Sequence, residues 1–344
     1  SDTACSACHV PDGAEFDASV TGAHVIPINS TNIKGVKLEI VSVEGAVPGG
    51  SPVVTFKVTN NVGEAIAPVG MDYLAVTLAG PTSDYVNRVT ETIYRKADPL
   101  PPPPEVEDAG GGAFKYTFKA KIPKEATGTY AVAMEGYVME TIEGVKDPVR
   151  VPGFNPVTYV ALDGGKPVAR RKAVDRDNCN KCHQNLALHG TIRQNTEYCV
   201  LCHNPMGTDE ARRPSDAMPP NTINFRVLIH RIHSGAEAAK IYGFGGTLND
   251  FSDVEFPGDL AACQTCHVTG TYGLPLAKGV QPTIITQAGK VVSMTLPIRS
   301  VCTACHDGTA AGGHSELMTT GSGIETCEVC HGAGREFDVT KVHH

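Results

Sequence analysis

Every cysteine of the 344-residue chain belongs to a Cys-x-x-Cys-His motif, and the six motifs account for all twelve cysteines. The cysteines are Cys5, Cys8, Cys179, Cys182, Cys199, Cys202, Cys263, Cys266, Cys302, Cys305, Cys327 and Cys330. The histidines that complete the motifs are His9, His183, His203, His267, His306 and His331. In this motif the two thiols attach covalently to a haem, and the adjacent histidine becomes an axial ligand of the iron.

Two other uses of paired cysteines fit this pattern poorly. Structural zinc sites do not require a histidine directly after the second cysteine, and a disulfide framework has no use for one. Histidine is scarce, at 13 of 344 residues, so chance does not explain its presence after all six pairs. The motifs therefore predict six covalently bound haem c groups and no catalytic residue.

Seven histidines lie outside the motifs and are the candidates for the second axial ligand of each iron. They are His24, His189, His230, His233, His314, His343 and His344. An iron with two histidine ligands has no open position and is suited to electron transfer. His230 and His233 share one face of a helix and could serve two neighbouring haems.

Some of these candidates have other interpretations. The His-x-x-His pair could hold zinc, and the last two histidines could belong to a purification tag. Met206 and Met318 could also be axial ligands, although packing is the simpler role for them.

The 170 residues between Cys8 and Cys179 contain no cysteine and read as β structure. Polar and apolar residues alternate with period two in several segments, which is typical of strands with one solvated face. The predicted strands are 36–43, 52–59, 73–80, 114–122, 128–139 and 155–162. Regularly spaced strands separated by turns favour an all-β Greek-key sandwich or barrel. Residues 98–112, with Pro101–Pro104, are expected to form an exposed loop.

The remaining chain is too short for its five motifs to share an ordinary hydrophobic core. We expect a mostly coil domain with short helices, in which the haems form the core. One helix is legible within 221–235, with Asn221 or Thr222 as N-cap and Gly235 as its stop. Residues 283–296 are expected to form a hairpin, and the acidic stretch 243–260 a structural loop. The expected division is a haem-binding arm (1–33), a β domain (34–168) and a pentahaem domain (169–344).

Charge and hydropathy restrict the partners and the location. The net charge of −8, made more negative by haem propionates, disfavours nucleic acid. No apolar run is long enough for a transmembrane helix. The chain begins at Ser1 without a visible leader, so we expect an exported chain that has already been processed.

The second half resembles a known family. The stretches Cys179–Gly190, Cys199–Pro205, Phe225–Gly235, Tyr242–His267 and Glu325–His343 are similar to the pentahaem module of the OmcA/MtrC outer-surface multihaem cytochromes. The resemblance begins near residue 34, because a β domain precedes that module in the family. It implies five distal ligands, His189, His230, His233, His314 and His343. It also implies electron delivery to minerals, electrodes or partner cytochromes.

The chain departs from the usual family plan of two β domains and two pentahaem modules. It has one of each, plus an N-terminal haem motif for which His24 is the candidate distal ligand. His344 is an alternative, within the chain or from a neighbouring copy in a head-to-tail polymer. The leading interpretation is extracellular electron transfer. A reductase of a small oxyanion and a periplasmic electron shuttle are the alternatives.

Overall fold

The computed structural model describes residues 5, 9–98 and 105–343. Cys8, His344 and the predicted polyproline segment Pro101–Pro104 lie outside these residues. The strands are β1 (Lys37–Glu44), β2 (Val53–Thr59), β3 (Tyr73–Gly80), β4 (Asn87–Arg95), β5 (Val106–Gly110), β6 (Ala113–Thr117), β7 (Thr129–Glu140), β8 (Val149–Pro152), β9 (Val157–Ala161), β10 (Lys240–Tyr242), β11 (Leu248–Asp250), β12 (Thr283–Gln287) and β13 (Lys290–Thr295). The helices are α1 (Val20–Ala23), α2 (Arg176–His183), α3 (Thr196–Cys202), α4 (Phe225–His233), α5 (Pro297–Cys302), α6 (Thr309–Leu317), α7 (Glu328–His331) and α8 (Val339–Val342).

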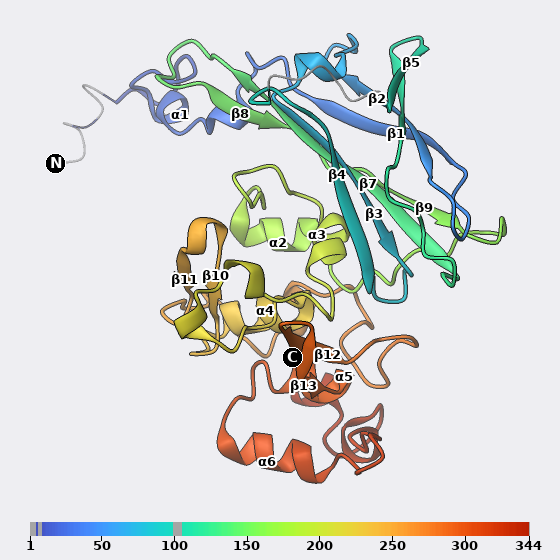
Figure 1. Cartoon of the computed structure of the whole chain (residues 1–344). Coiled ribbons are helices and arrows are strands. Elements are labelled where there is room, and N and C mark those ends of the chain that lie inside the picture. The colour runs from blue at the N-terminus through green and yellow to red at the C-terminus, as the bar shows by residue number, and fades with distance from the viewer. Residues whose placement is uncertain (1–4, 6–8, 99–104, 344) are drawn as a thin grey trace.

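Strands β1–β9 form two antiparallel sheets (Figure 1), as the alternating pattern predicts. One sheet has the order β1-β2-β6-β5, and the other has the order β4-β3-β7-β8 with β9 paired to β7. The expectation of a loop over 98–112 was wrong in part, because β5 pairs with β6 there. Strand β6 ends at Thr117, earlier than predicted. The sequence pattern did not indicate β4 and β8.

The hydrophobic core of these strands lies between the two sheets. Alternate residues Val54, Phe56 and Val58 of β2 are fully buried, as expected for one inward-facing side of a strand. They pack with Val76 and Val132 from the facing sheet. We call strands β1–β9 the sandwich.

The outer face of the β3–β7 sheet is also covered. Small side chains such as Ala79, Ala131 and Ala133 pack there against Tyr198 and Leu201 of α3. Their small size lets the helix approach the sheet closely. The sheet thereby carries the helix that contains Cys199 and Cys202 (Figure 1).

Residues 169–344 form short helices, hairpins and loops below the sandwich (Figure 1). Their buried hydrophobic side chains are few: Tyr198, Val200, Leu201, Val227, Leu228, Ala236, Ala239, Leu274, Ile298 and Ala304. The predicted hairpin is present as β12 and β13. The expectation of a structural loop over 243–260 was wrong in part, because β11 lies within it and pairs with β10 just before it.

Helix α4 begins later than predicted. Its N-cap is Asn224 rather than Asn221 or Thr222. The Thr222 hydroxyl accepts the amide of Asn224, and the Asn221 side chain donates to the carbonyl of Lys240. Both polar side chains therefore stabilise the approach to the helix. Gly235 has a φ of 62° and follows the helix end, as expected of a residue that stops a helix.

A buried carboxylate joins the sandwich to the rest of the chain. Asp84, whose side chain is 1% exposed, lies 3.1 Å from Arg170, 2.8 Å from Arg171 and 3.8 Å from Arg226 of α4. It also accepts the backbone N–H of Gln281 at 2.7 Å. Three segments that are distant in sequence therefore meet on one carboxylate. This contact fixes the position of the sandwich relative to residues 169–344, the cysteine-rich segment.

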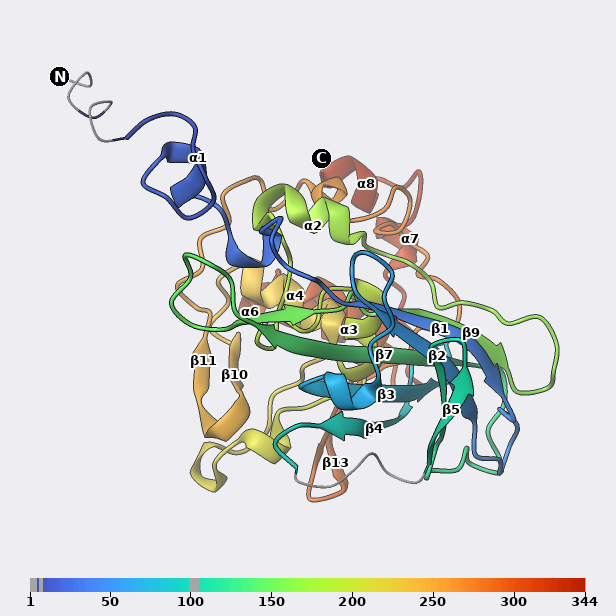
Figure 2. The same cartoon turned by 90° about the horizontal axis from the view of Figure 1, so that it is seen from above.

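The N-terminal arm runs from the edge of the sandwich away from the body of the protein (Figure 2). Glu15 ties its turns together, because this carboxylate accepts hydrogen bonds from the side chains of Ser30, Thr31 and Asn32. Among the described residues, no helix has the length and apolar character needed to cross a membrane.

Candidate functional site

The structure brings five motif histidines against five histidines from outside the motifs. The ring centroids are 6.0 Å apart in His183–His233, His189–His203 and His230–His267, 5.9 Å in His306–His343 and 6.2 Å in His314–His331. The partners within a pair are as far as 50 residues apart in sequence. Each pair joins a predicted proximal ligand to a predicted distal ligand.

This spacing fits two imidazoles on opposite sides of one metal ion. An imidazole nitrogen lies about 2 Å from a bound metal, and the ring centre lies about 1 Å further back. Two such rings are therefore about 6 Å apart across a single ion. Aromatic rings in direct contact can have the same spacing, so the assignment also depends on the partners, because each of the five pairs joins one motif histidine to one histidine outside the motifs. The residues of the five pairs thus fit the haem group that the motifs imply.

Backbone carbonyls fix the tautomer of several of these rings. An Nδ1–H that donates to a carbonyl leaves the Nε2 lone pair for a metal. Such contacts run from His203 to Ile223 at 2.8 Å, from His233 to Ile229 at 2.8 Å, from His343 to Val339 at 3.1 Å and from His331 to Phe337 at 3.2 Å. Each of these four rings is therefore in the tautomer whose Nε2 lone pair can bind iron.

Burial keeps several of the paired rings neutral. It lowers the pKa of His230 to about 4, with His267 as the next cause. It also lowers the pKa of His189 to about 4, assisted by the nearby Arg193 guanidinium. Burial likewise lowers the pKa of His203 and of His267. A neutral imidazole is the form that ligates a metal, so these four rings need no deprotonation step near pH 7.

Neighbouring motifs lie close to one another. Val174 pairs with His267 in an isolated bridge, and the Asn178 side chain donates to the carbonyl of Cys266 at 3.3 Å. These contacts bring the motif on α2 next to the motif that ends at His267. His230 and His233 on α4 approach His267 and His183, respectively, so one helix serves both motifs.

The pKa shifts of three cysteines indicate that other motifs are also close to one another. Burial and then the Cys327 thiol raise the pKa of Cys302 to about 11. Burial and then Cys263 raise the pKa of Cys305. Cys179 is among the groups that raise the pKa of Cys199, although burial is the main cause. Each of the five motifs therefore has another motif close to it.

The N-terminal motif is arranged differently. His9 Nδ1 donates to the carbonyl of Ala18 at 3.2 Å, and His24 Nδ1 donates to that of Val20 at 2.6 Å. Both rings thus present Nε2, as His203, His233, His331 and His343 do. Within the described residues, however, neither ring faces another histidine at the 6 Å spacing.

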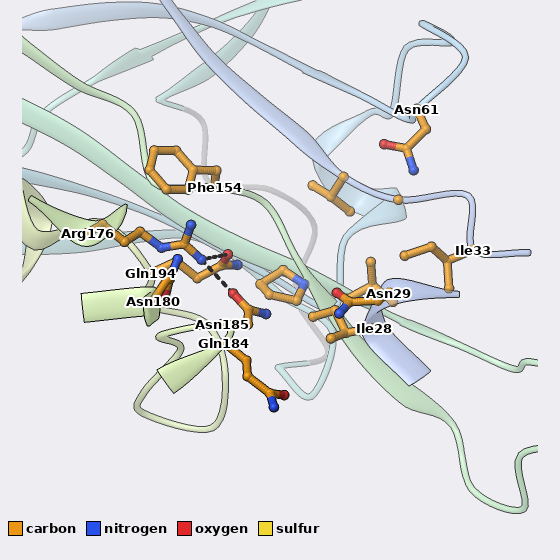
Figure 3. A pocket seen from close by; sticks show the side chains of 14 residues that line it. Ile28, Asn29, Ile33, Asn61, Phe154, Arg176, Asn180, Gln184, Asn185 and Gln194 are labelled. Atoms are coloured by element: carbon orange, nitrogen blue, oxygen red, sulfur yellow. Dashed lines mark hydrogen bonds between the residues drawn. The ribbon is translucent and has the colours of Figure 1, made fainter. Parts of the chain in front are cut away.

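A polar cavity of about 380 Å³ lies between the arm, the sandwich and α2 (Figure 3). Ile28 and Asn29 of the arm line it on one side, and Asn180 and Gln184 on the other. Arg176, its one charged residue, donates to Asn185 at 2.5 Å (Figure 3). Its other lining residues are polar amides and apolar side chains. The cavity places the arm against the helix of Cys179 and Cys182.

Sequence reasoning missed the residues around His189. Arg193 forms a bidentate ion pair with Glu135 of β7, with Nε–Oε2 and Nη2–Oε1 distances of 2.6 and 3.1 Å. The Glu135 side chain is 1% exposed. One signal was available, since Glu135 is the one charged residue in the stretch Thr129–Gly136.

Comparisons with known proteins agree with this arrangement. The family model described as outer membrane cytochrome MtrC/MtrF-like, domains II/IV, matches residues 171–344. The chain is 28% identical over 216 residues to the multiheme cytochrome MtrC of Shewanella baltica (strain OS185). That match covers 58% of this chain and 28% of the relative.

Two solved structures have a similar fold. The crystal structure of MtrC from Shewanella baltica OS185 matches with a TM-score of 0.58 and 17% identity, over 87% of this chain and 52% of that one. The outer membrane decaheme cytochrome OmcA matches with a TM-score of 0.54 and 20% identity, over 88% and 47%. The chain thus spans about half the length of these structures. With a family match over half of its length, the chain belongs to the MtrC/MtrF-like outer membrane cytochrome family.

Proposed function

We propose that the chain is a hexahaem c-type cytochrome that transfers electrons at or beyond the cell surface. The observation that supports this best is the set of five histidine pairs with centroids about 6 Å apart. When bound, each haem supplies one-electron chemistry between Fe(III) and Fe(II).

The chain's own residues hold and shield these groups. The twelve motif cysteines attach the six haems, and His9, His183, His203, His267, His306 and His331 are the proximal ligands. The distal ligands are His233, His189, His230, His343 and His314, in the order of the proximal histidines from His183 to His331. With so few buried hydrophobic residues beyond residue 168, the haems form the core of a pentahaem domain (169–344). Residues 34–168 form the β domain and residues 1–33 the arm.

The pairing argues against catalysis. A reductase of a small oxyanion needs an iron with an open position, whereas a second histidine blocks each of five sites. The N-terminal site is the exception and is where the reductase alternative would apply. Electron transfer therefore accounts for more of the sites than a reductase does.

The contacts between motifs favour a continuous row of sites. Its order is Cys199–His203, Cys179–His183, Cys263–His267, Cys302–His306 and Cys327–His331. The first of these lies against the sandwich through α3, and the last follows α6, which lies far from the sandwich in Figure 1. Such a row spans the pentahaem domain from one end to the other.

The N-terminal site extends this function to a partner. His24 is its candidate distal ligand, and His344 of the same or a neighbouring chain is the alternative. A histidine supplied by a neighbour would join copies head to tail into a haem wire. Other partners are cytochromes and extracellular electron acceptors. Export to the cell surface fits the family, and a periplasmic shuttle is the alternative.

Low-temperature EPR of the oxidised protein at high and low concentration tests the proposal, after mass spectrometry has counted the haems. Six haems, of which at least five are low-spin at both concentrations, are expected. A sixth that becomes high-spin only on dilution indicates a ligand from a neighbouring copy. Two or more persistent high-spin haems would contradict the proposal and favour a reductase.

A further inference from the structure

We infer that Glu135 of the sandwich, acting through Arg193, positions His189 as an axial ligand. The β domain would then control the ligation of one haem directly. This inference rests on the proposed function, because it takes His189 to be the partner of His203 across an iron.

His189 differs from the other four distal candidates in what holds it. His230 and His233 belong to α4, His314 belongs to α6, and His343 is the C-cap of α8. A helix backbone fixes the direction of its side chains. His189 instead lies on the loop between α2 and α3, so its direction must be fixed by contacts from outside the loop.

The loop itself is strained at this histidine. His189, Gly190 and Thr191 have φ values of 54°, 69° and 75°, in the left-handed region that residues other than glycine rarely adopt. Such strain persists only where the surrounding structure enforces it. Leu188 and Arg193 close the loop with two backbone hydrogen bonds, of 2.9 and 3.2 Å.

Three side chains of the sandwich hold this closed loop. Glu135 binds the Arg193 guanidinium through both carboxylate oxygens. Arg150 of β8 donates to the carbonyl of Gly190 at 2.7 Å. Asn155 donates to the carbonyl of Ile192 at 3.1 Å. The contacts fall on residues 190, 192 and 193, directly after the histidine, and they come from β7, from β8 and from the connection between β8 and β9.

Of these three contacts, the ion pair between Glu135 and Arg193 should matter most for the position of the loop. The Glu135 carboxylate is 1% exposed and also accepts the Tyr73 hydroxyl at 3.2 Å. Among the described residues, it is the only carboxylate that forms an ion pair with Arg193. Removal of the carboxylate would leave the guanidinium, 25% exposed, without a counter-charge and release it toward solvent. The strained backbone would then relax and withdraw His189 from the iron.

The experiment compares variants of the haem-loaded full chain by low-temperature EPR. His189→Ala is the reference for complete loss of the ligand. Glu135→Ala removes the ion pair with Arg193, and Glu135→Gln keeps one hydrogen-bond acceptor for Arg193 without the negative charge. Glu91→Ala is the matched control, because Glu91 of β4 accepts the Tyr116 hydroxyl at 2.6 Å and neither Glu91 nor Tyr116 contacts a histidine pair in the structure described.

We expect His189→Ala to convert one haem in six to high-spin. Glu135→Ala should convert up to the same amount, Glu135→Gln less, and Glu91→Ala none. Added imidazole should restore the low-spin signal in Glu135→Ala, because it replaces the missing ligand. A merely structural role would lower the urea midpoint of unfolding while every haem stayed low-spin.

The outcomes separate the inference from the proposal beneath it. If His189→Ala leaves the spin states unchanged, the ligand assignment itself fails. If His189→Ala gives a high-spin haem and both Glu135 variants do not, the Glu135–Arg193 pair does not position His189 and the inference fails. Should Glu135→Ala yield no folded protein, Glu135→Gln and Arg150→Met decide, and unchanged spectra in both would overturn the inference.

Discussion

The imidazole planes of His230 and His267 are nearly parallel, with an angle of 12° between them and 6.0 Å between ring centroids. The other four pairs are twisted. Their interplanar angles are 82° for His183–His233, 45° for His189–His203, 66° for His306–His343 and 76° for His314–His331. The proposed iron site between His230 and His267 should therefore differ electronically from the other four.

This difference predicts an EPR signature. Parallel imidazoles donate into the same iron d orbital and split the d levels of ferric iron, whereas perpendicular ones do not. We expect one rhombic low-spin signal from the His230–His267 site and broad, highly anisotropic signals from the twisted sites. His230→Ala should remove the rhombic signal, and His314→Ala should leave it in place. Loss of the rhombic signal in His314→Ala instead would refute this assignment.

The cap of α8 predicts a second effect. Asp338 accepts the amides of Gly334 and Thr340 at 2.6 and 2.9 Å, and His343 is the C-cap of the same four-residue helix. Because so short a helix depends on its cap, Asp338→Ala should loosen His343 and make the His306 haem partly high-spin. Asp338→Asn, which keeps an acceptor for Thr340, should change the EPR spectrum less. Equal spectra for wild type and Asp338→Ala would show that α8 does not need its cap.

The same carboxylate predicts a pH dependence. Hydrogen bonds from Gly334, from the amide of Thr340 and from its hydroxyl hold the pKa of Asp338 below its ordinary value of 3.8. A depressed carboxyl pKa contributes stability that is present above the ordinary value and lost as the pH falls through the folded-state value. Wild type should therefore gain high-spin signal only below about pH 4, and Asp338→Asn should lack this transition.

The junction at Asp84 predicts a loss of stability. Removal of one partner from a buried ion pair costs about 3–5 kcal/mol, and Asp84 faces three guanidiniums. Asp84→Ala should lower the free energy of unfolding by about that amount, measured by urea denaturation of the haem-loaded protein. The control is Lys96→Ala, which breaks an exposed pair with Asp72 and should cost less than about 1 kcal/mol. Similar midpoints for the two variants would contradict the role given to Asp84.

Much of this arrangement could be predicted from the sequence, for physical reasons. Strands such as β2 alternate so regularly that one face must be buried, and the Cys-x-x-Cys-His spacing carries its own chemistry. Helix α4 was predicted because its apolar residues recur at helical spacing. Each of these features is local, so a short stretch of sequence contains the information.

The features that could not be predicted are those created by distant contacts. Helix α4 begins after Asn224 and not at the predicted N-cap, because the Asn221 side chain donates to the carbonyl of Lys240 instead of capping the helix. Strand β5 follows a proline-rich stretch and exists because β6 supplies its hydrogen bonds. The histidine partnerships, such as that of His183 with His233, also depend on tertiary folding. The Glu135–Arg193 pair joins residues 58 positions apart; the lone charge in its strand singles out Glu135, but no local pattern indicates Arg193 as its partner.

Without the haems, the sandwich and the cysteine-rich segment should differ in stability. The sandwich has a continuous hydrophobic core, whereas residues 169–344 bury few apolar side chains. A chain made without haem attachment should therefore keep the sandwich folded and lose the structure of the cysteine-rich segment, because burial of apolar surface is the main stabilising term. Limited proteolysis should leave a protected fragment close to residues 34–168 and degrade the remainder. The haem-loaded chain, digested in parallel, should resist cleavage after residue 175. Equal resistance of both segments without haem would show that the protein part of 169–344 is stable by itself.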